Sequence, residues 1–346
     1  MVGKLLQKLR VSFPRVLLQV FIWVSFSVSA WGDTYGAHPQ ALRLIEEMVV
    51  KHQFDRGELK RLFKQAEQKQ SILDAISRPA EKTKSWREYQ PIFVNVARTS
   101  KGVAFWRRHR EALRRAEVAY GVPQEIIVAI IGVETRYGKN TGGYRVIDAL
   151  STLAFDFPER AEFFRGELKQ FLLLTREQQQ NPLDLTGSYA GAMGYGQFIP
   201  SSYRRYAVDF DGDKFADIWG NPVDAIGSIG NYFQQHGWVR DQAVVVRARV
   251  KEGYNREIIN LSLQPQHTLA QLRQAGFVPL YDYPTDWEAT AMQLEGRDEI
   301  EFWLGLKNFY VITRYNHSRL YAMAVFQLSQ AIKTEMNKRQ KSARLP

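Results

Sequence analysis

The chain has 346 residues, 45% of them hydrophobic and 24% charged, which is enough for about two globular domains with a real core. Its 8 Trp, 16 Tyr and 20 Phe exclude a disordered chain. The absence of cysteine excludes disulfides, thiolate metal sites, cysteine nucleophiles and lipid anchors on cysteine. Residues 1–30 carry +4 of the net charge of +11, and the remaining +7 favours an anionic partner, such as nucleic acid, a membrane surface or an acidic cell-wall polymer.

The first 30 residues are typical of a secretory signal peptide. Four basic residues lead to a mostly apolar run over 16–28, and the small residues that follow suit cleavage after Ala30. The run is short for a membrane span, which favours cleavage over an uncleaved anchor. We therefore expect a soluble periplasmic protein with no transmembrane anchor after cleavage, and nucleic acid becomes the least expected partner.

Hydrophobic periodicity predicts a mostly helical α+β protein. Helical spacing recurs through most of the chain, whereas a β-like period appears only after Trp238. The predicted helices fall within 38–120 and over 123–137, 159–175, 222–236 and 320–336. The predicted strands lie at 243–250, 257–263, 291–295 and 299–303, with a hairpin turn at 296–298. This order indicates a helical body with a small β-rich insertion over 241–305.

Glu134 is the first candidate for chemistry. It follows an apolar run over 126–131 in a helix that we expect to begin at Pro123 and to end at Gly138. Such a helix is buried, and both burial and the negative end of the helix dipole favour the protonated carboxyl. A general acid for glycosidic cleavage needs that property. The alternative is a structural ion pair at the helix end with Arg136 or Arg145.

A glycine-rich segment over 187–203 is the second candidate. Its glycines let the backbone approach a ligand closely, and Ser188 and Gln197 offer hydrogen bonds for sugar hydroxyls or amides. The alternative is a tight turn between helices.

An acidic loop over 209–224 is the third candidate. Asp209, Asp211 and Asp213 alternate as in a calcium loop, but position 12 is Gly220, so Asp224 has to close a longer loop than an EF-hand has. The alternative is a solvated Asp-rich turn.

The last candidate is the segment 308–321. Tyr315, Asn316 and Tyr321 combine aromatic faces with polar ends, which suits stacking on sugar rings. The alternative is core packing where a strand leads into a helix.

Four motifs together resemble the B-type lytic murein transglycosylases. They are Gly132–Gly138, Gly191–Phe198, Pro222–Gly227 and Arg314–Asn316, and the resemblance spans about residues 38–335. It implies a lysozyme-like core over 109–240, joined by 306–321. It also implies a helical domain over 31–108, joined by 322–346, and the small β domain over 241–305. The implied activity is cleavage of the MurNAc–GlcNAc β-1,4 bond of peptidoglycan without water, in cell-wall turnover.

The resemblance also assigns roles to residues. Glu134 becomes the single catalytic acid and base, and calcium becomes a structural rather than a catalytic ion, with no organic cofactor. The implied partners are peptidoglycan glycan strands, with other cell-wall enzymes as further candidates. Substrate contacts are implied for Tyr89, Ser188, Gln197, Tyr232, Tyr315, Asn316 and Tyr321. Calcium ligands are implied for Asp209, Asp211, Asp213, Asp224 and the carbonyl of Phe215.

Two other functions remain open from the sequence. A hydrolytic muramidase needs a second carboxylate near Glu134, for which Asp148 and Asp156 are candidates. A non-catalytic wall-binding protein needs the aromatic residues but no acidic Glu134.

Overall fold

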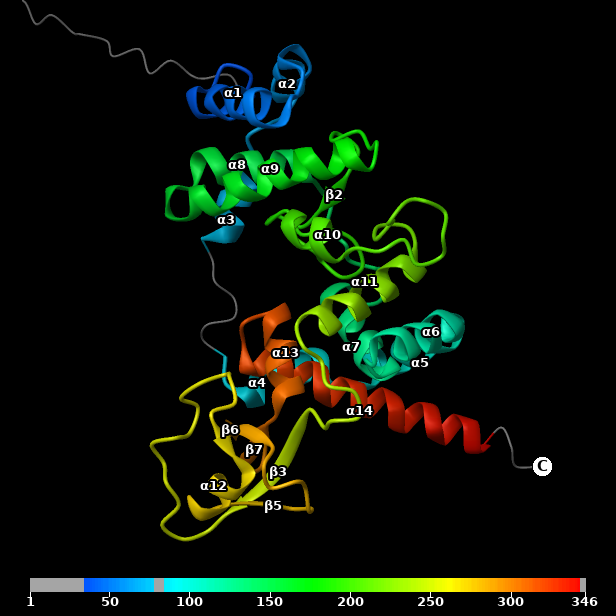
Figure 1. Cartoon of the computed structure of the whole chain (residues 1–346), viewed down its shortest axis with the longest axis vertical. Helices are drawn as coiled ribbons and strands as arrows, with labels where there is room; N and C mark the ends of the chain where they lie inside the picture. Colours follow the sequence, from blue (N-terminus) through cyan, green and yellow to red (C-terminus); the bar gives the residue numbers. More distant parts are fainter. Residues whose placement is uncertain (1–33, 78–83, 343–346) are drawn as a thin grey trace, which may run out of the picture. The chain divides into compact units, whose positions relative to one another are not determined.

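The computed structural model describes residues 34–77 and 84–342, which belong to one compact unit of the chain. Helices dominate this part, as predicted (Figure 1). The α-helices are α1 (Pro39–His52), α2 (Arg56–Phe63), α3 (Gln70–Ile76), α4 (Trp86–Phe93), α5 (Val96–Arg108), α6 (Arg110–Tyr120), α7 (Gln124–Thr135), α8 (Val146–Asp156), α9 (Ala161–Glu177), α10 (Pro200–Tyr206), α11 (Pro222–Gln235), α12 (Leu269–Gln274), α13 (Lys307–Tyr315) and α14 (Arg319–Ser342). A 3-10 turn, η1 (Pro158–Arg160), separates α8 from α9.

The strands form two antiparallel sheets. A two-stranded sheet pairs β1 (Tyr144–Arg145) with β2 (Thr186–Gly187). The larger sheet has the order β4-β6-β7-β3-β5. Its strands are β3 (Val245–Val250), β4 (His267–Thr268), β5 (Phe277–Pro279), β6 (Glu288–Glu295) and β7 (Ile300–Gly305). The predicted hairpin is confirmed, because β6 and β7 pair from Glu295↔Ile300 onward across 296–299.

The strand predicted over 257–263 is wrong. Asn260 takes a left-handed backbone conformation there (φ 56°), which breaks an extended chain. Its backbone N–H bonds to the carbonyl of Ala291, and its side-chain amide bonds to the carbonyl of Gln293. The apolar Ile258 and Ile259 instead pack together against the core of the larger sheet.

The described residues form two hydrophobic cores. The main core lies among the helices, and a second core of nine buried residues between Val246 and Leu306 lies on the larger sheet and α12. Within the helical part, α8 runs beside α9, and α14 packs on α4, α5 and α7 (Figure 1). The boundaries proposed for the three domains stay a prediction.

Helix α7 lies at the centre of the helical part. All but two of its twelve residues are buried, because it contacts α14, α5, α6 and α11. Pro123 is the residue before the helix rather than its first position. The helix ends at Thr135 and not at Tyr137, because Arg136, Tyr137 and Gly138 all have positive φ angles. The left-handed cap is therefore Arg136, whose N–H bonds to the carbonyl of Ile131.

Among the described residues, no single helix is long and apolar enough to cross a membrane. In this part of the chain, only α6 and α7 taken together have the length and composition of a membrane span, and the pair is bent by 114° at its junction. The predicted signal peptide over 1–30 lies outside the described residues.

Candidate active site

Glu134 lies in the last turn of α7 and keeps part of its surface exposed. Ile130 and Ile131, one turn before it, are fully buried. The hydroxyl of Tyr321, in the first turn of α14, donates a 2.5 Å hydrogen bond to Oε1 of Glu134. The carboxyl thus sits at the boundary between the core and solvent and is oriented by a neutral donor.

The charge of this carboxylate contributes to the raised pKa values of two nearby tyrosines. Burial raises the pKa of Tyr321 well above its usual value, and the nearby charge of Glu134 raises it further. Burial and the charge of Glu134 raise the pKa of Tyr315 in the same way. Both phenols therefore stay neutral and act as hydrogen-bond donors at any pH near neutrality.

Arg98, from α5, binds carbonyl groups at the C-terminal end of α7. Its Nη1 lies 2.8 Å from the carbonyl oxygen of Gly132 and 3.4 Å from that of Val133, so a cation meets the negative end of the helix. The side chain is only 8% exposed, and burial lowers its pKa. Sequence reasoning missed this residue, because an arginine in a mixed polar helix carries no signal of burial.

Thr135 joins α7 to the glycine-rich segment. Its Oγ1 lies 3.0 Å from the carbonyl oxygen of Tyr195 and accepts a 3.0 Å hydrogen bond from the N–H of Gly138. This contact also went unpredicted, because the two residues that it joins are 60 positions apart.

Glycine is required twice where this segment passes close to other chain segments. Gly194 has a φ of 68°, and a Cβ there would lie 2.3 Å from the carbonyl oxygen of Ile218. A Cβ on Gly196 would lie 2.8 Å from the hydroxyl of Tyr315, which instead donates a 2.5 Å hydrogen bond to the carbonyl of Gly196. These two glycines therefore let the segment pack against α13, where it contacts Tyr315, whose pKa is raised by the charge of Glu134.

Ser188 and Gln197 are both partly exposed in this segment. The hydroxyl of Ser188 accepts backbone N–H groups from Ala190 and Ala192, at 3.3 and 3.1 Å. Gln197 has a φ of 51°, and its amide donates to the carbonyls of Thr141 and Gly194, at 3.0 and 2.9 Å.

The predicted aromatic residues are packed more tightly than a sugar-stacking platform requires. Tyr321 is 2% exposed, and Tyr89 and Tyr232 are buried as well. Tyr232 contacts Tyr315 edge-on at 4.8 Å and donates a 2.6 Å hydrogen bond to the carbonyl of Arg314. The segment 308–321 leads from helix α13 into helix α14, and not from a strand into a helix. The rings of Tyr232, Tyr315 and Tyr321 therefore pack α11, α13 and α14 together. Asn316, the C-terminal cap of α13, is partly exposed.

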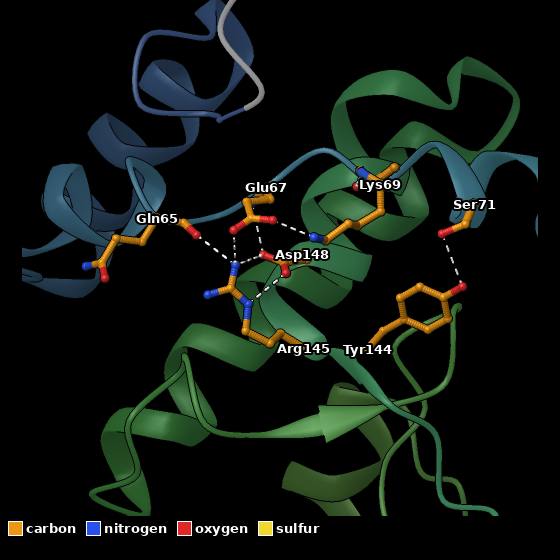
Figure 2. A network of polar contacts seen from close by, with 8 residues as sticks. Gln65, Glu67, Lys69, Ser71, Tyr144, Arg145 and Asp148 are labelled. Carbon is orange, nitrogen blue, oxygen red and sulfur yellow. Dashed lines mark hydrogen bonds and ion pairs between the residues drawn. The ribbon is translucent and has the colours of Figure 1, made fainter.

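The two carboxylates considered as a second catalytic group form other contacts, and Figure 2 shows those of Asp148. Asp148 is 1% exposed, forms a 2.7 Å ion pair with Arg145 and accepts the N–H of Glu67 at 2.9 Å. Asp156 accepts a hydrogen bond from the hydroxyl of Tyr35. Arg145, considered as a partner for Glu134, bonds Asp148 and Glu67 instead. These groups bind the N-terminal helices to α8.

The acidic loop brings four carboxylates together. One oxygen from each of Asp209, Asp211, Asp213 and Asp224 lies within 4.8 Å of the others. Asp224 lies in the first turn of α11 and is fully buried, and it accepts backbone N–H groups from Phe210 and Asp217. Burial raises its pKa, and the charge of Asp211 adds to that effect. Clustered oxygen ligands of this kind fit a calcium ion.

Comparison with known proteins shows the family of this chain. A family model described as transglycosylase SLT domain matches residues 37–330. The membrane-bound lytic murein transglycosylase B of Escherichia coli is 45% identical over 315 residues, which are 88% of this chain and 86% of that protein.

Solved structures agree as well. Soluble lytic transglycosylase SltB1 of Pseudomonas aeruginosa is 55% identical, with a TM-score of 0.83 over 86% of this chain and all of that one. Slt35 of E. coli in complex with calcium is 44% identical, with a TM-score of 0.80 over 88% and 96% of the two chains. SltB3 of P. aeruginosa in complex with NAG-anhNAM-pentapeptide is 29% identical, with a TM-score of 0.78 over 87% and 80%. The predicted lysozyme-like, mostly helical fold is confirmed by these neighbours.

Proposed function

Since this chain belongs to the transglycosylase SLT family, we propose that Glu134 is its single catalytic acid and base. Like its named relatives, the protein is a lytic murein transglycosylase, a lyase that acts on peptidoglycan. The finer proposal is that it cleaves the MurNAc–GlcNAc β-1,4 bond and leaves 1,6-anhydro-MurNAc ends.

In the proposed reaction, Glu134 first donates its proton to the glycosidic oxygen, and the bond from that oxygen to C1 of MurNAc breaks. The N-acetyl group of the same sugar stabilises the positive charge that develops at C1. Glu134, now a carboxylate, takes the proton of the C6 hydroxyl, whose oxygen attacks C1 and closes the anhydro ring. No water is consumed, because the nucleophile is held within the substrate itself.

The hydrogen bond from Tyr321 to Glu134 is the observation that carries this proposal. A neutral phenol can orient the carboxyl in both protonation states and does not compete for the proton. A hydrolase normally uses a second carboxylate, and the two candidates for it, Asp148 and Asp156, bond Arg145 and Tyr35. The anhydro sugar in the SltB3 complex further supports a non-hydrolytic product.

We also propose that substrate binds along the residues that converge beside Glu134. Ser188, Gln197 and Asn316 are partly exposed and offer polar groups to sugar hydroxyls and N-acetyl amides. The buried Tyr89, Tyr232 and Tyr321 and the half-buried Tyr315 act through their edges and hydroxyls and by fixing the helices, rather than as open stacking faces.

A calcium ion is proposed as a structural ligand of the acidic loop. Asp209, Asp211, Asp213 and Asp224 would hold it, with the carbonyl of Phe215 as a further oxygen ligand. The calcium complex of Slt35 supports this proposal. The ion's charge would neutralise the carboxylates and fix the loop to α11.

We propose export to the periplasm, with mature protein beginning at Trp31 and acting in cell-wall turnover together with other cell-wall enzymes. The pattern of residues 1–30 supports export. N-terminal sequencing of the protein from the soluble periplasmic fraction tests this, and intact Met1 on membrane-bound protein contradicts it.

Product analysis tests the proposed function as a whole. Purified sacculi are digested with the full enzyme, and the released muropeptides are analysed by mass before and after borohydride reduction. Anhydro products are lighter by one water than those of a muramidase, and borohydride does not reduce them. Reducing MurNAc ends as the main product would establish a hydrolase, and unchanged sacculi would establish a wall-binding protein.

A further inference from the structure

The turn that follows Glu134 has a rare backbone conformation. Arg136 and Tyr137 have φ angles of 52° and 63°, and Gly138 follows at 82°. Residues with a side chain seldom adopt this left-handed conformation, and they keep it only where the surrounding structure holds the chain. The position of Glu134 at the end of α7 therefore depends on the contacts that hold this turn.

Arg98, in α5, is bonded to the chain on both sides of Glu134. Before the proposed acid, Nη1 of Arg98 donates to the carbonyl oxygens of Gly132 and Val133, at 2.8 and 3.4 Å. After it, the carbonyl oxygen of Arg98 accepts a 2.9 Å hydrogen bond from the hydroxyl of Tyr137. One residue of a neighbouring helix thus joins the last turn of α7 to the left-handed turn that follows.

Packing restricts the side chains that make these bonds. Arg98 is 8% exposed, and its guanidinium lies over the ring of Phe93 at 5.0 Å. The hydroxyl of Tyr137 lies against both α5 and α7, because a Cβ on Gly102 or on Gly132 would come within 2.6 Å of it. Burial raises the pKa of Tyr137, so this hydroxyl keeps the proton that it donates.

We propose that Arg98 is a positioning residue, which acts with Tyr137 to hold Glu134 in the orientation that the reaction needs. The proposal rests on the proposed function of Glu134. Tyr321 orients the carboxyl group at its tip, whereas Arg98 and Tyr137 fix the backbone that carries it. A displacement of about 1 Å at a reacting group costs about 10²-fold in rate, so a loosened turn lowers kcat without weakening substrate binding.

Steady-state kinetics of three variants on defined glycan strands test the proposal, with kcat expressed per folded molecule. Arg98→Met removes the donor to the carbonyls of α7, and we expect kcat to fall about 10²-fold while KM changes less than about twofold. Arg98→Lys keeps the cation but not the planar fork, and should recover about tenfold of that loss. Tyr137→Phe removes only the bond to the carbonyl of Arg98, and should lower kcat about fivefold.

Matched controls remove the same kinds of interaction elsewhere in the chain. Arg176→Met alters an arginine that donates to the carbonyl of His52 at 2.7 Å and lies over the ring of Phe54 at 4.0 Å. Tyr203→Phe removes another buried phenol that donates to a carbonyl, that of Ala216 at 2.8 Å. We expect both controls to leave kcat and KM unchanged, even where they lower the melting temperature.

Melting curves show which variants fold, and Tyr137→Phe keeps the test decisive if the Arg98 variants do not. Wild-type kcat in Tyr137→Phe, or in folded Arg98→Met, overturns the proposal, as does a rise in KM at unchanged kcat. A fall in kcat that the controls share overturns it too, because the loss would then be a general effect of lower stability. Glu134→Gln is measured alongside, and wild-type turnover in that variant overturns the proposed function instead.

Discussion

The hydroxyl of Tyr321 is hydrogen-bonded to Oε1 of Glu134 at 2.5 Å, across 187 positions of the sequence. The contact joins the last turn of a buried helix to the first turn of the C-terminal helix. It gives the proposed acid a fixed orientation through a neutral donor.

Replacing Glu134 with Gln keeps the shape of the side chain and removes its titratable proton. We expect kcat on purified sacculi to fall by about 10²–10⁴-fold or more, while folding and glycan binding persist. Glu159→Gln, at an exposed glutamate outside the site, serves as the matched control. More than about a tenth of wild-type turnover in Glu134→Gln contradicts the assignment.

The variant Tyr321→Phe removes only the donor to Glu134. We expect kcat to fall about tenfold, because a hydrogen bond to a charged group is lost, with little change in KM. Steady-state kinetics on defined glycan strands measure the two constants separately. Tyr310→Phe in α13 is the control, and equal kcat for both variants contradicts an orienting role for Tyr321.

Calcium is expected to raise the melting temperature, because it binds the folded loop and not the unfolded chain. At a concentration 100 times its Kd, the gain is about 2.7 kcal/mol. Thermal melts in calcium and in chelator measure it, and Asp224→Asn should abolish the difference while Asp286→Asn, at an exposed site elsewhere, preserves it. Initial rates should not depend on calcium, so a chelator that stops catalysis in the folded enzyme contradicts a purely structural ion.

The variant Asp148→Ala separates a structural carboxylate from a catalytic one. It leaves Arg145 and the N–H of Glu67 without their buried acceptor, so we expect a loss of about 3 kcal/mol in the free energy of unfolding. Denaturant titration measures this loss. The folded fraction should still release the same products, and a specific loss of kcat at unchanged stability would assign Asp148 to catalysis.

His236 makes stability depend on pH near the tyrosine cluster. Its ring stacks on Tyr232 at 4.0 Å, and burial lowers its pKa, with the charges of Arg314 and Arg205 adding to the effect. The folded state therefore binds fewer protons than the unfolded state below the usual histidine pKa, and stability is lost as pH falls through that range. Unfolding at pH 7 and pH 5 should show a larger loss for wild type than for His236→Gln. An equal loss contradicts the prediction.

Local pattern accounts for much of the fold. The apolar run over 126–131 predicted a buried helix, and turn residues at 296–298 predicted the hairpin. The prediction of a strand at 257–263 was wrong, because the same apolar spacing suits an extended chain and a chain that turns at a left-handed Asn260. The predicted end of α7 was wrong for a similar reason, since nothing local requires the left-handed cap to be Arg136 rather than Gly138, although both have positive φ angles.

The sequence indicated candidate site residues but not how the fold brings them together. Glu134 and the aspartates stood out by residue type and spacing. The roles of Tyr89 and Tyr232 came only from resemblance, and the burial of these rings depends on helices that meet from distant parts of the chain. Arg98 and Thr135 carried no signal at all, because their importance lies in carbonyl groups that the fold places beside them.

The late position of α14 in the chain also sets the time at which the site is completed. Polypeptides are synthesised from the N-terminus, and domains form as their segments emerge. A nascent chain that has reached Gly305 already contains Glu134, the glycine-rich segment and the acidic loop, but not Tyr315 or Tyr321. It also lacks the helix that covers α4, α5 and α7. The proposed acid therefore acquires its orienting partner only when nearly the whole chain has been made.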